Sequence, residues 1–486
     1  MKFFHAILLG GVFLTRLHAL ESAEIAAVAK RFDAPTGDEQ YQARIELNRL
    51  VAQATIPGKG DCAAVTKLLI AALQAPETSK EASKYLLRAL ARIGTVEAVA
   101  PLAKILAGQD PMLKEEARAA LSWIRNPQAV AVLEAALAKA VDPRAKISLL
   151  NALASQQSAS SVPLLAPLMA AGDPELARAA LTAIARIGGP AAVTALTTAS
   201  AKVPAALKPD AERALLVASA GDARTAMLIY QSSSSATIKL AAFLALMQSA
   251  PDSAKPGLIE AALKSADPDL RHAALACGLE TRLPSLQATL AKSFDQMPKD
   301  DRLIVLANIR QLQPAAAAEK IALSRIASAE EDERVSAITA LGNFPTPSAF
   351  HAVLEALGVR EPRINQAAAN AIANMTYPAA ETTLLAMLKG NSSPDKILAL
   401  KAMVSRQVPE ASAILLFVIK GADKDASKEA MKTLYFTASI DDLRSLCAAT
   451  AATQDPDLHK GLVSICSRIA TRIKTPEALA LVKDLK

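Results

Sequence analysis

A basic residue recurs near the start of one helix in most repeated segments of this chain, and this series is the main candidate for chemistry. Evenly spaced cations can line a groove and bind an acidic ligand. They can instead pair with acidic side chains or carbonyl groups of a neighbouring segment and so form a structural ladder. We favour the ladder, although the residue pattern alone leaves both interpretations open. The candidate binding residues are Lys114, Lys146, Arg213, Lys239, Arg271, Arg302, Arg334, Arg363, Lys396 and Lys428.

The basic series includes one earlier residue and is interrupted at three positions. Arg44 stands before the other members, and Ser83, Ala177 and His459 take the place of a basic residue. If the ladder interpretation holds, replacing Arg302 by alanine should lower stability by about 1–3 kcal/mol where the bond is buried. If the series is a ligand stripe, the same change should leave stability within about 0.5 kcal/mol and weaken an acidic partner.

Residue types that usually carry catalysis are scattered. Beyond the first segment of the chain the histidines are His272, His351 and His459, each in a different repeat, so they indicate no metal site. No GxSxG serine and no phosphate-binding glycine loop occurs. We therefore expect no catalytic residue, no metal and no cofactor. Trp123, the single tryptophan, follows apolar residues near a helix end and is expected in the core.

The four cysteines, Cys62, Cys277, Cys447 and Cys466, show no metal-ligand spacing. Cys447 and Cys466 fall on consecutive antiparallel helices. Counted from the turn between them, they stand at different heights, which predicts Cα atoms too far apart for a disulfide. We expect buried free thiols.

The elements that would position these residues are pairs of short amphipathic helices, most evident in Glu330–Gly358. In the first helix Ala337, Ala340, Leu341 and Phe344 share one face. One such pair cannot bury its apolar stripes alone and requires a copy on either side. The second helix repeats the spacing with Phe350, Val353, Leu354 and Leu357.

Copies of this pair occur almost end to end. Asp-Pro marks many helix starts, at Asp110, Asp142, Asp173, Asp267 and Asp455, because the carboxylate caps free N–H groups and proline fits the first turn. Successive starts lie roughly 31 residues apart, which predicts about 14 helix pairs. The first-type helices are expected to begin near Asp38, Lys80, Pro111, Pro143, Pro174, Asp210, Ala236, Pro268, Asp301, Glu333, Pro362, Asp395, Ala426 and Pro456.

The repeated pattern resembles a known family. Its clearest copies are ARIGTVEAVAPLAKIL (Ala91–Leu106) and ARIGGPAAVTAL (Ala185–Leu196), which resemble HEAT repeats, most of all the short bacterial type named after phycobilin lyases. The resemblance covers nearly the whole chain after residue 37. It implies an all-α fold, a right-handed α-solenoid with one helix of each pair on a concave surface. Relatives include bilin-attaching and lysine-hydroxylating enzymes, but the iron-binding His-Glu pairs of the hydroxylases are missing here.

The beginning of the chain predicts export. Lys2, the apolar run Phe3–Leu14 and the small residue Ala19 are typical of a secretory signal peptide over residues 1–19. The alternative is an ordinary first helix of the solenoid. No later segment reaches the roughly 18 apolar residues of a membrane span, so we expect none in the mature chain.

Residues 201–235 interrupt the rhythm of the repeats. A long connection followed by a short helix suggests a bend between an N-terminal arc, residues 20–200, and a C-terminal arc, residues 236–486. The alternative is a drifted repeat that stacks normally. Residues Thr475–Leu485 are expected to form the last helix, with a solvent-facing side that caps the stack.

The charge of the chain is mildly basic. The net charge is +7, or +5 once Lys2 and Arg16 leave with the leader, and aromatic residues make up only 3%. Without long basic runs this argues against a nucleic-acid partner. We predict a periplasmic or secreted scaffold, not an enzyme, that binds a protein or peptide on its concave surface. The alternatives are a bilin-lyase-like enzyme or accessory protein, and a binder of an acidic polymer.

Overall fold

The computed structural model describes residues 22–200, 202–281, 283–406, 412–483 and 485. These residues form α-helices and short 3-10 helices, and no strand occurs among them. The predicted signal peptide, residues 1–19, lies outside the described residues. The prediction of an all-α solenoid built from helix pairs is confirmed, while its hand, its repeat number and its period stay predictions.

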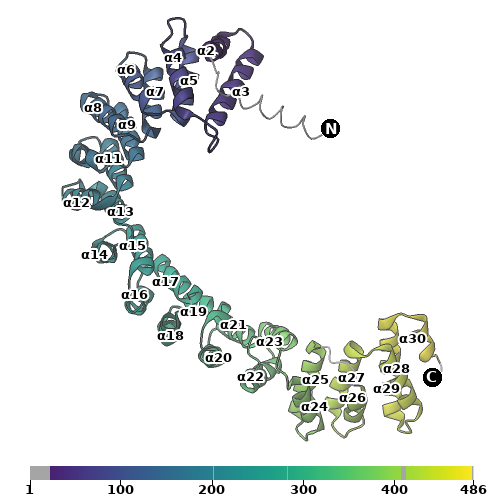
Figure 1. Ribbon diagram of the computed structural model, residues 1–486. Coiled ribbons are helices and arrows are strands. Elements are labelled where there is room, and N and C mark those ends of the chain that lie inside the picture. Colours follow the sequence, from purple (N-terminus) through teal and green to yellow (C-terminus); the bar gives the residue numbers. More distant parts are fainter. Residues whose placement is uncertain (1–21, 201, 282, 407–411, 484, 486) are drawn as a thin grey trace, which may run out of the picture. The chain divides into compact units, whose positions relative to one another are not determined.

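The chain packs as two compact units, Met1–Ser249 (unit 1) and Ala250–Lys486 (unit 2). Within each unit, first-type and second-type helices alternate along the chain. In Figure 1 the first-type helices follow one side of unit 1 and the second-type helices follow the other. The first-type helices of unit 1 are α3 (Gly37–Ala54), α5 (Lys80–Ile93), α7 (Pro111–Trp123), α9 (Pro143–Gln156), α11 (Pro174–Ile187), α13 (Lys208–Ala218) and α15 (Ala236–Ser249).

The second row of unit 1 is less regular, because 3-10 turns replace part of several helices. Its members are α2 (Ser22–Lys30) with η2 (Arg31–Asp33), α4 (Cys62–Gln74), η3 (Val96–Ala98) with α6 (Val99–Leu106), α8 (Pro127–Lys139), η4 (Ala159–Ser161) with α10 (Val162–Leu165) and η5 (Ala166–Ala170), α12 (Gly189–Ser200), η6 (Ala205–Leu207) before α13, and α14 (Ala223–Ser232).

Unit 2 continues the same alternation. Its first-type helices are α17 (Pro268–Glu280), α19 (Lys299–Ala307), α21 (Glu331–Leu341), α23 (Pro362–Asn374), α25 (Ser393–Arg406), α27 (Lys424–Thr437) and α29 (Pro456–Ile473). Its second-type elements are α16 (Lys255–Leu263), α18 (Pro284–Ser293) with η7 (Phe294–Gln296), η8 (Ile309–Gln311) with α20 (Ala315–Ser324), α22 (Pro347–Leu357), α24 (Ala380–Lys389), α26 (Ser412–Ile419), α28 (Ile440–Ala451) and α30 (Pro476–Leu481).

Helix starts agree closely with the sequence. Every first-type helix begins within two residues of its predicted start. The aspartates act as expected: Asp110 Oδ1 accepts a hydrogen bond from the backbone N–H of Met112 at 2.9 Å, and Asp142 Oδ2 accepts one from Ala145 at 2.8 Å. The last helix is shorter than predicted, since α30 ends at Leu481 and not at Leu485.

The core is a continuous row of apolar contacts between successive pairs. The eight residues predicted to face inward from α21 and α22, among them Leu341, Phe344 and Phe350, are all buried. Unit 1 shows the same pattern, because α5 packs on α7, α9 on α11, and α11 on α13. Each pair therefore depends on its neighbours, as expected for a repeat solenoid.

Polar side chains add a second link at the ends of the first-type helices. Gln156 on α9 donates hydrogen bonds from Nε2 to the carbonyls of Leu121 and Ile124 on the preceding repeat, at 2.6 and 3.0 Å. Arg406 on α25 does the same for Ile372 and Met375, at 2.9 and 2.8 Å. Carbonyls that a helix end would leave unpaired are thus satisfied by the next repeat.

Residues 201–235 hold the predicted irregularity without a break in packing. Residue 201 aside, the segment contains η6, α13 and α14, and α13 packs against α11, α12, α14 and α15. The division between the two units falls later, between Ser249 and Ala250. A bend at 201–235 stays a prediction. Among the described helices, none is both long and apolar enough to cross a membrane.

Candidate functional site

Arg271, on α17, forms an ion pair with the next repeat. Its Nε donates to Asp301 Oδ2 on α19 at 2.7 Å, and its Nη1 donates to the carbonyls of Ser265 and Ala266 at 3.0 and 3.2 Å. The Asp301 side chain is 0% exposed. The second carboxylate oxygen of Asp301 lies 3.3 Å from Nε2 of His272. One guanidinium therefore joins its own helix, the preceding turn and the next first-type helix.

Arg302 and Arg334 repeat this arrangement one and two steps further along unit 2. Arg302 donates from Nε to Glu333 Oε1 at 2.6 Å and from Nη1 to the Met297 carbonyl at 2.6 Å. Arg334 holds both oxygens of Glu361, at 3.0 and 2.5 Å. Glu333 is only 1% exposed, so its charge depends on Arg302. We call these three pairs, Arg271–Asp301, Arg302–Glu333 and Arg334–Glu361, the arginine ladder.

Arg363 pairs in the opposite direction. Its guanidinium donates to Glu331 at 3.2 Å and Asp332 at 2.8 Å, both on the preceding helix α21. Lys299 adds to the same cluster with Glu330 at 2.7 Å. These side chains are substantially exposed, so the cluster is a surface network beside the buried carboxylates of Asp301 and Glu333.

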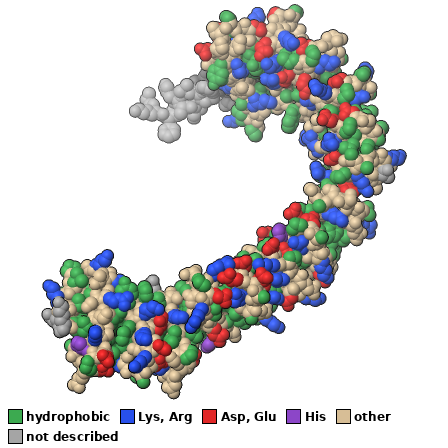
Figure 2. Space-filling view, turned by 180° about the vertical axis from the view of Figure 1, so that it is seen from behind, with side chains coloured by type: hydrophobic (Ala, Val, Ile, Leu, Met, Phe, Trp, Pro, Cys, Tyr) green, Lys and Arg blue, Asp and Glu red, His purple; other side chains and the backbone are tan. Residues whose placement is uncertain are grey.

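The pKa shifts agree with this division. Burial by itself raises the pKa of Glu333, but hydrogen bonds from Ser328 and Arg302 and the charges of Arg302 and Arg325 outweigh it and leave the pKa below its ordinary value of 4.5. At the surface, the hydrogen bond from Arg363 and then its charge lower the pKa of Asp332. Figure 2 shows acidic and basic side chains intermingled over this part of unit 2.

The remaining six members of the series behave differently. They form no ion pair with any residue that the structure describes. Lys114 and Arg213 are exposed, and Lys146 and Lys239 are half-buried. The six are Lys114, Lys146, Arg213, Lys239, Lys396 and Lys428. Whether any member binds a ligand stays a prediction.

One sequence signal separates the two groups. In two of the three ladder pairs the acceptor is the residue directly before the next basic residue, Asp301 before Arg302 and Glu333 before Arg334. In the third pair the acceptor, Glu361, stands two residues before Arg363. In unit 1 the corresponding residue before Lys146 is Ala145, which offers no carboxylate. This signal is present in the sequence, but it lies in the acidic residues and not in the spacing of the cations.

Trp123 corrects one expectation. Its side chain is 69% exposed at the end of α7, and it is not in the core. The buried stripe of this helix consists of Ala117, Ala120, Leu121 and Ile124. Trp123 lies about 120° around the helix from the centre of that stripe. Proximity in sequence to buried residues was therefore misleading.

The four cysteines differ in burial, although all were expected to be buried free thiols. Cys447 and Cys466 are buried, as expected, whereas Cys62 and Cys277 are only partly buried. The thiols of Cys447 and Cys466 influence each other's pKa, so the two side chains are neighbours, and both cysteines are free. That their Cα atoms stand too far apart for a disulfide stays a prediction. Across the described ranges, no group of three or more His, Cys, Asp or Glu side chains is placed to hold a metal ion.

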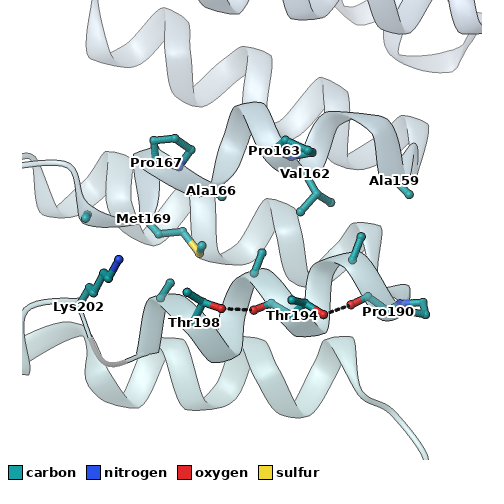
Figure 3. A pocket seen from close by; sticks show the side chains of 14 residues that line it. Ala159, Val162, Pro163, Ala166, Pro167, Met169, Pro190, Thr194, Thr198 and Lys202 are labelled. Atoms are coloured by element: carbon teal, nitrogen blue, oxygen red, sulfur yellow. Dashed lines mark hydrogen bonds between the residues drawn. The ribbon is translucent and has the colours of Figure 1, made fainter.

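The second-type side of unit 1 carries an open apolar groove that the sequence analysis did not predict (Figure 3). It lies between α10 with η5 on one side and α12 on the other, and its volume is about 670 Å³. Pro167 has no N–H to continue the hydrogen bonding of α10, so that helix stops after one turn. Small side chains on both walls leave the space open. The lining residues are Ala159, Val162, Pro163, Ala166, Pro167, Met169, Ala170, Pro190, Ala191, Thr194, Ala195, Thr198, Ala199 and Lys202.

The groove is apolar along its length and basic at one end. The hydroxyls of Thr194 and Thr198 donate to backbone carbonyls of their own helix, at 2.9 and 2.8 Å, and so present mainly methyl groups. Met169 points between the two walls, and Lys202 stands at one end of the row (Figure 3). This arrangement suits the apolar side chains of a peptide with an acidic residue at one end.

Comparison with known protein families finds a match in two segments of the chain. The family model for HEAT repeats matches residues 66–154, in unit 1, and residues 320–403, in unit 2. One segment of each unit is therefore similar to HEAT repeats. No curated protein matches the chain.

Comparison with solved structures gives distant matches. One match is a Kap95p chain, from a structure in which Kap95p binding induces the switch loops of RanGDP to adopt the GTP-bound conformation. It has 12% identity to this chain and a TM-score of 0.39, and the match covers 96% of this chain and 69% of the Kap95p chain. A homology model of the AP-3 complex has 9% identity and a TM-score of 0.41, covering 92% and 94%. Human deoxyhypusine hydroxylase has 18% identity and a TM-score of 0.24, covering 57% and 95%. At these scores the matches assign no partner or activity to this chain.

Proposed function

We propose that this chain is an exported, non-catalytic HEAT-repeat scaffold that binds a protein or peptide partner. The observation that carries the proposal is the groove between η5 and α12, because it offers apolar surface on a framework that needs no rearrangement to receive a ligand. A volume near 670 Å³ accommodates several apolar side chains. Lys202 favours a partner segment with an acidic residue beside its apolar ones.

The arginine ladder supports a scaffold in a different way. Its cations are engaged with Asp301, Glu333 and Glu361, so they hold neighbouring repeats in register and are not free for an acidic polymer. The unpaired lysines of unit 1 leave polymer binding as an outcome for experiment. The finer resemblance, to repeats of the phycobilin-lyase type, stays a prediction from Ala91–Leu106 and Ala185–Leu196.

A peptide-display selection against the full chain tests the binding proposal. Selected peptides should combine two or more large apolar residues with an acidic residue. Thr198→Trp, which fills the groove, should weaken their binding at least about tenfold. Thr197→Trp is the matched control, because Thr197 is exposed on the same helix and makes the same kind of backbone hydrogen bond but does not line the groove. Equal affinity for both variants would remove the groove from the proposal.

Export is tested separately. Mass spectrometry of the protein purified from its native host should find a mature N-terminus near Leu20, as the leader Lys2 to Ala19 predicts. An intact Met1 would contradict export without affecting the groove.

A further inference from the structure

The last helix hairpin of unit 2 brings two thiols together. Cys447 on α28 is 8% exposed and Cys466 on α29 is 0% exposed. Thr450 lies three residues after Cys447, so the two share one face of α28. Thr450 Oγ1 is 3.7 Å from Cys466 Sγ, and the Cys447 thiol is near enough to Cys466 to affect its pKa. Cys466 therefore packs against the turn of α28 that carries both Cys447 and Thr450.

The surroundings of the two thiols limit the reactions that they can undergo. The Thr450 hydroxyl already donates to the Leu446 carbonyl at 2.7 Å, so it is available to Cys466 as an acceptor. Burial raises the pKa of Cys466 to about 12, which leaves almost no thiolate for nucleophilic chemistry in the folded chain. Within the described part of the chain, no third side chain joins the two sulfurs in a metal-binding group. Oxidation of the pair is the chemistry that the contact leaves open.

We propose that Cys447 and Cys466 form a disulfide that joins α28 to α29. Its formation in the cell rests on the proposed export, because an oxidising compartment supplies the disulfide donor. The Cys447 thiolate, on the more accessible side chain, attacks a disulfide of oxidised glutathione or of a thiol oxidoreductase and releases one donor thiol. The Cys466 thiolate then attacks the mixed disulfide and releases the second. Two protein thiols lose two protons and two electrons, and one donor disulfide becomes two thiols.

The position of the pair explains the value of such a bond. In a solenoid each repeat is held by contacts with its neighbours. Among the described residues, the helix that follows α29 is α30, which is only six residues long. A disulfide between α28 and α29 limits the conformations that this hairpin can adopt when it detaches from its neighbours, and so stabilises it.

The reaction must occur before the thiols are buried, and the experiment reflects this. The full chain is unfolded in urea, refolded in a mixture of reduced and oxidised glutathione, treated with N-ethylmaleimide and digested for peptide mapping. We expect one cross-linked peptide pair containing Cys447 and Cys466, with Cys62 and Cys277 carrying the maleimide. Modification of all four cysteines, or random pairing, would overturn the proposal.

Variants separate the bond from its consequences. Cys277→Ser, which removes a partly buried thiol elsewhere in unit 2, should leave the cross-link intact. Cys447→Ser should abolish it. Hydrogen exchange of α28–α30 should be slower in the oxidised than in the reduced protein, and this difference should vanish in Cys447→Ser. If exchange is the same in both redox states, the bond does not stabilise this hairpin.

Protein from the native host distinguishes a failed bond from failed export. A cross-link together with a mature N-terminus near Leu20 supports both proposals. A cross-link formed on refolding, but reduced thiols and an intact Met1 in the host, would keep the pairing and contradict export. A mature N-terminus with both thiols reduced would contradict the disulfide alone.

Discussion

Arg302 in unit 2 and Lys114 in unit 1 stand at the same place in their repeats, a few residues into a first-type helix, but they have different surroundings. Arg302 is largely buried and joins α19 to Glu333 on α21 and to the Met297 carbonyl. Lys114 is exposed and forms no ion pair with the described residues. The difference lies in the next repeat, which presents Glu333 in one case and Ala145 in the other. A recurring cation therefore becomes structural only where the adjacent repeat supplies its carboxylate.

The physical reason is the cost of burying a charge. A carboxylate as buried as that of Glu333 is tolerated because the Arg302 guanidinium and Ser328 hydrogen-bond to it. An exposed lysine keeps its hydration and requires no partner. Glu212 shows the converse case in unit 1: it is buried, the preceding repeat has Ala177 in place of a cation, and the Ser233 hydroxyl donates to it at 2.6 Å.

Removing Arg302 should have the largest effect. Arg302→Ala leaves the Glu333 carboxylate buried without its charged partner and should cost about 3 kcal/mol. Urea denaturation followed by circular dichroism measures the loss, and hydrogen exchange should place it in α19 and α21. Arg310→Ala is the control, because Arg310 is exposed in the same unit and forms no ion pair with described residues. An equal loss of stability in Arg310→Ala would show that the carboxylate of the adjacent repeat does not make Arg302 special.

Acid should lower the stability of the ladder, and Glu333 should carry this pH dependence. The pKa of Glu333 is lowered on folding, so its contribution is complete above the ordinary value of 4.5 and is lost as pH falls through the lower folded value. Between about pH 6 and about pH 3 the protection of α21 against hydrogen exchange should fall further in the wild type than in Glu333→Gln. Parallel pH profiles for the two proteins would show that Glu333 does not carry the dependence.

Removing Lys114 should have almost no effect. The side chain is exposed, so Lys114→Ala should change stability by less than about 0.5 kcal/mol. Thermal melts of the full chain, run beside Arg302→Ala, make the measurement. A loss equal to that of Arg302→Ala would mean that position in the repeat, and not the neighbouring carboxylate, determines the effect.

Supplying the missing carboxylate should have the smallest effect. Ala145→Glu places an acid directly before Lys146, where unit 2 has Asp301 and Glu333, and Ala145 is exposed. A surface pair with Lys114 should add only about 0.3 kcal/mol. Comparing Ala145→Glu alone with Ala145→Glu plus Lys114→Ala isolates the pair. A gain that survives without Lys114 would come from a better helix start and not from the pair.

The sequence predicted the helices well because local chemistry determines where they begin. Asp110 and Asp142 cap their helices as the Asp-Pro signal implies, and Leu341 and Phe350 are buried as their spacing implies. The ladder was half predictable, since the cations recur visibly, but their acceptors required attention to the preceding residue. The groove was not predictable, because it depends on the space that remains between η5 and α12 after packing.

The most direct test of the account is a double-mutant cycle between Arg302 and Glu333. The account predicts that the double variant, Arg302→Ala with Glu333→Ala, is less destabilised than the sum of the single variants by about 2 kcal/mol, because each single change leaves a buried charge and the double change leaves none. Single variants whose effects add to within about 0.3 kcal/mol would contradict a structural ladder.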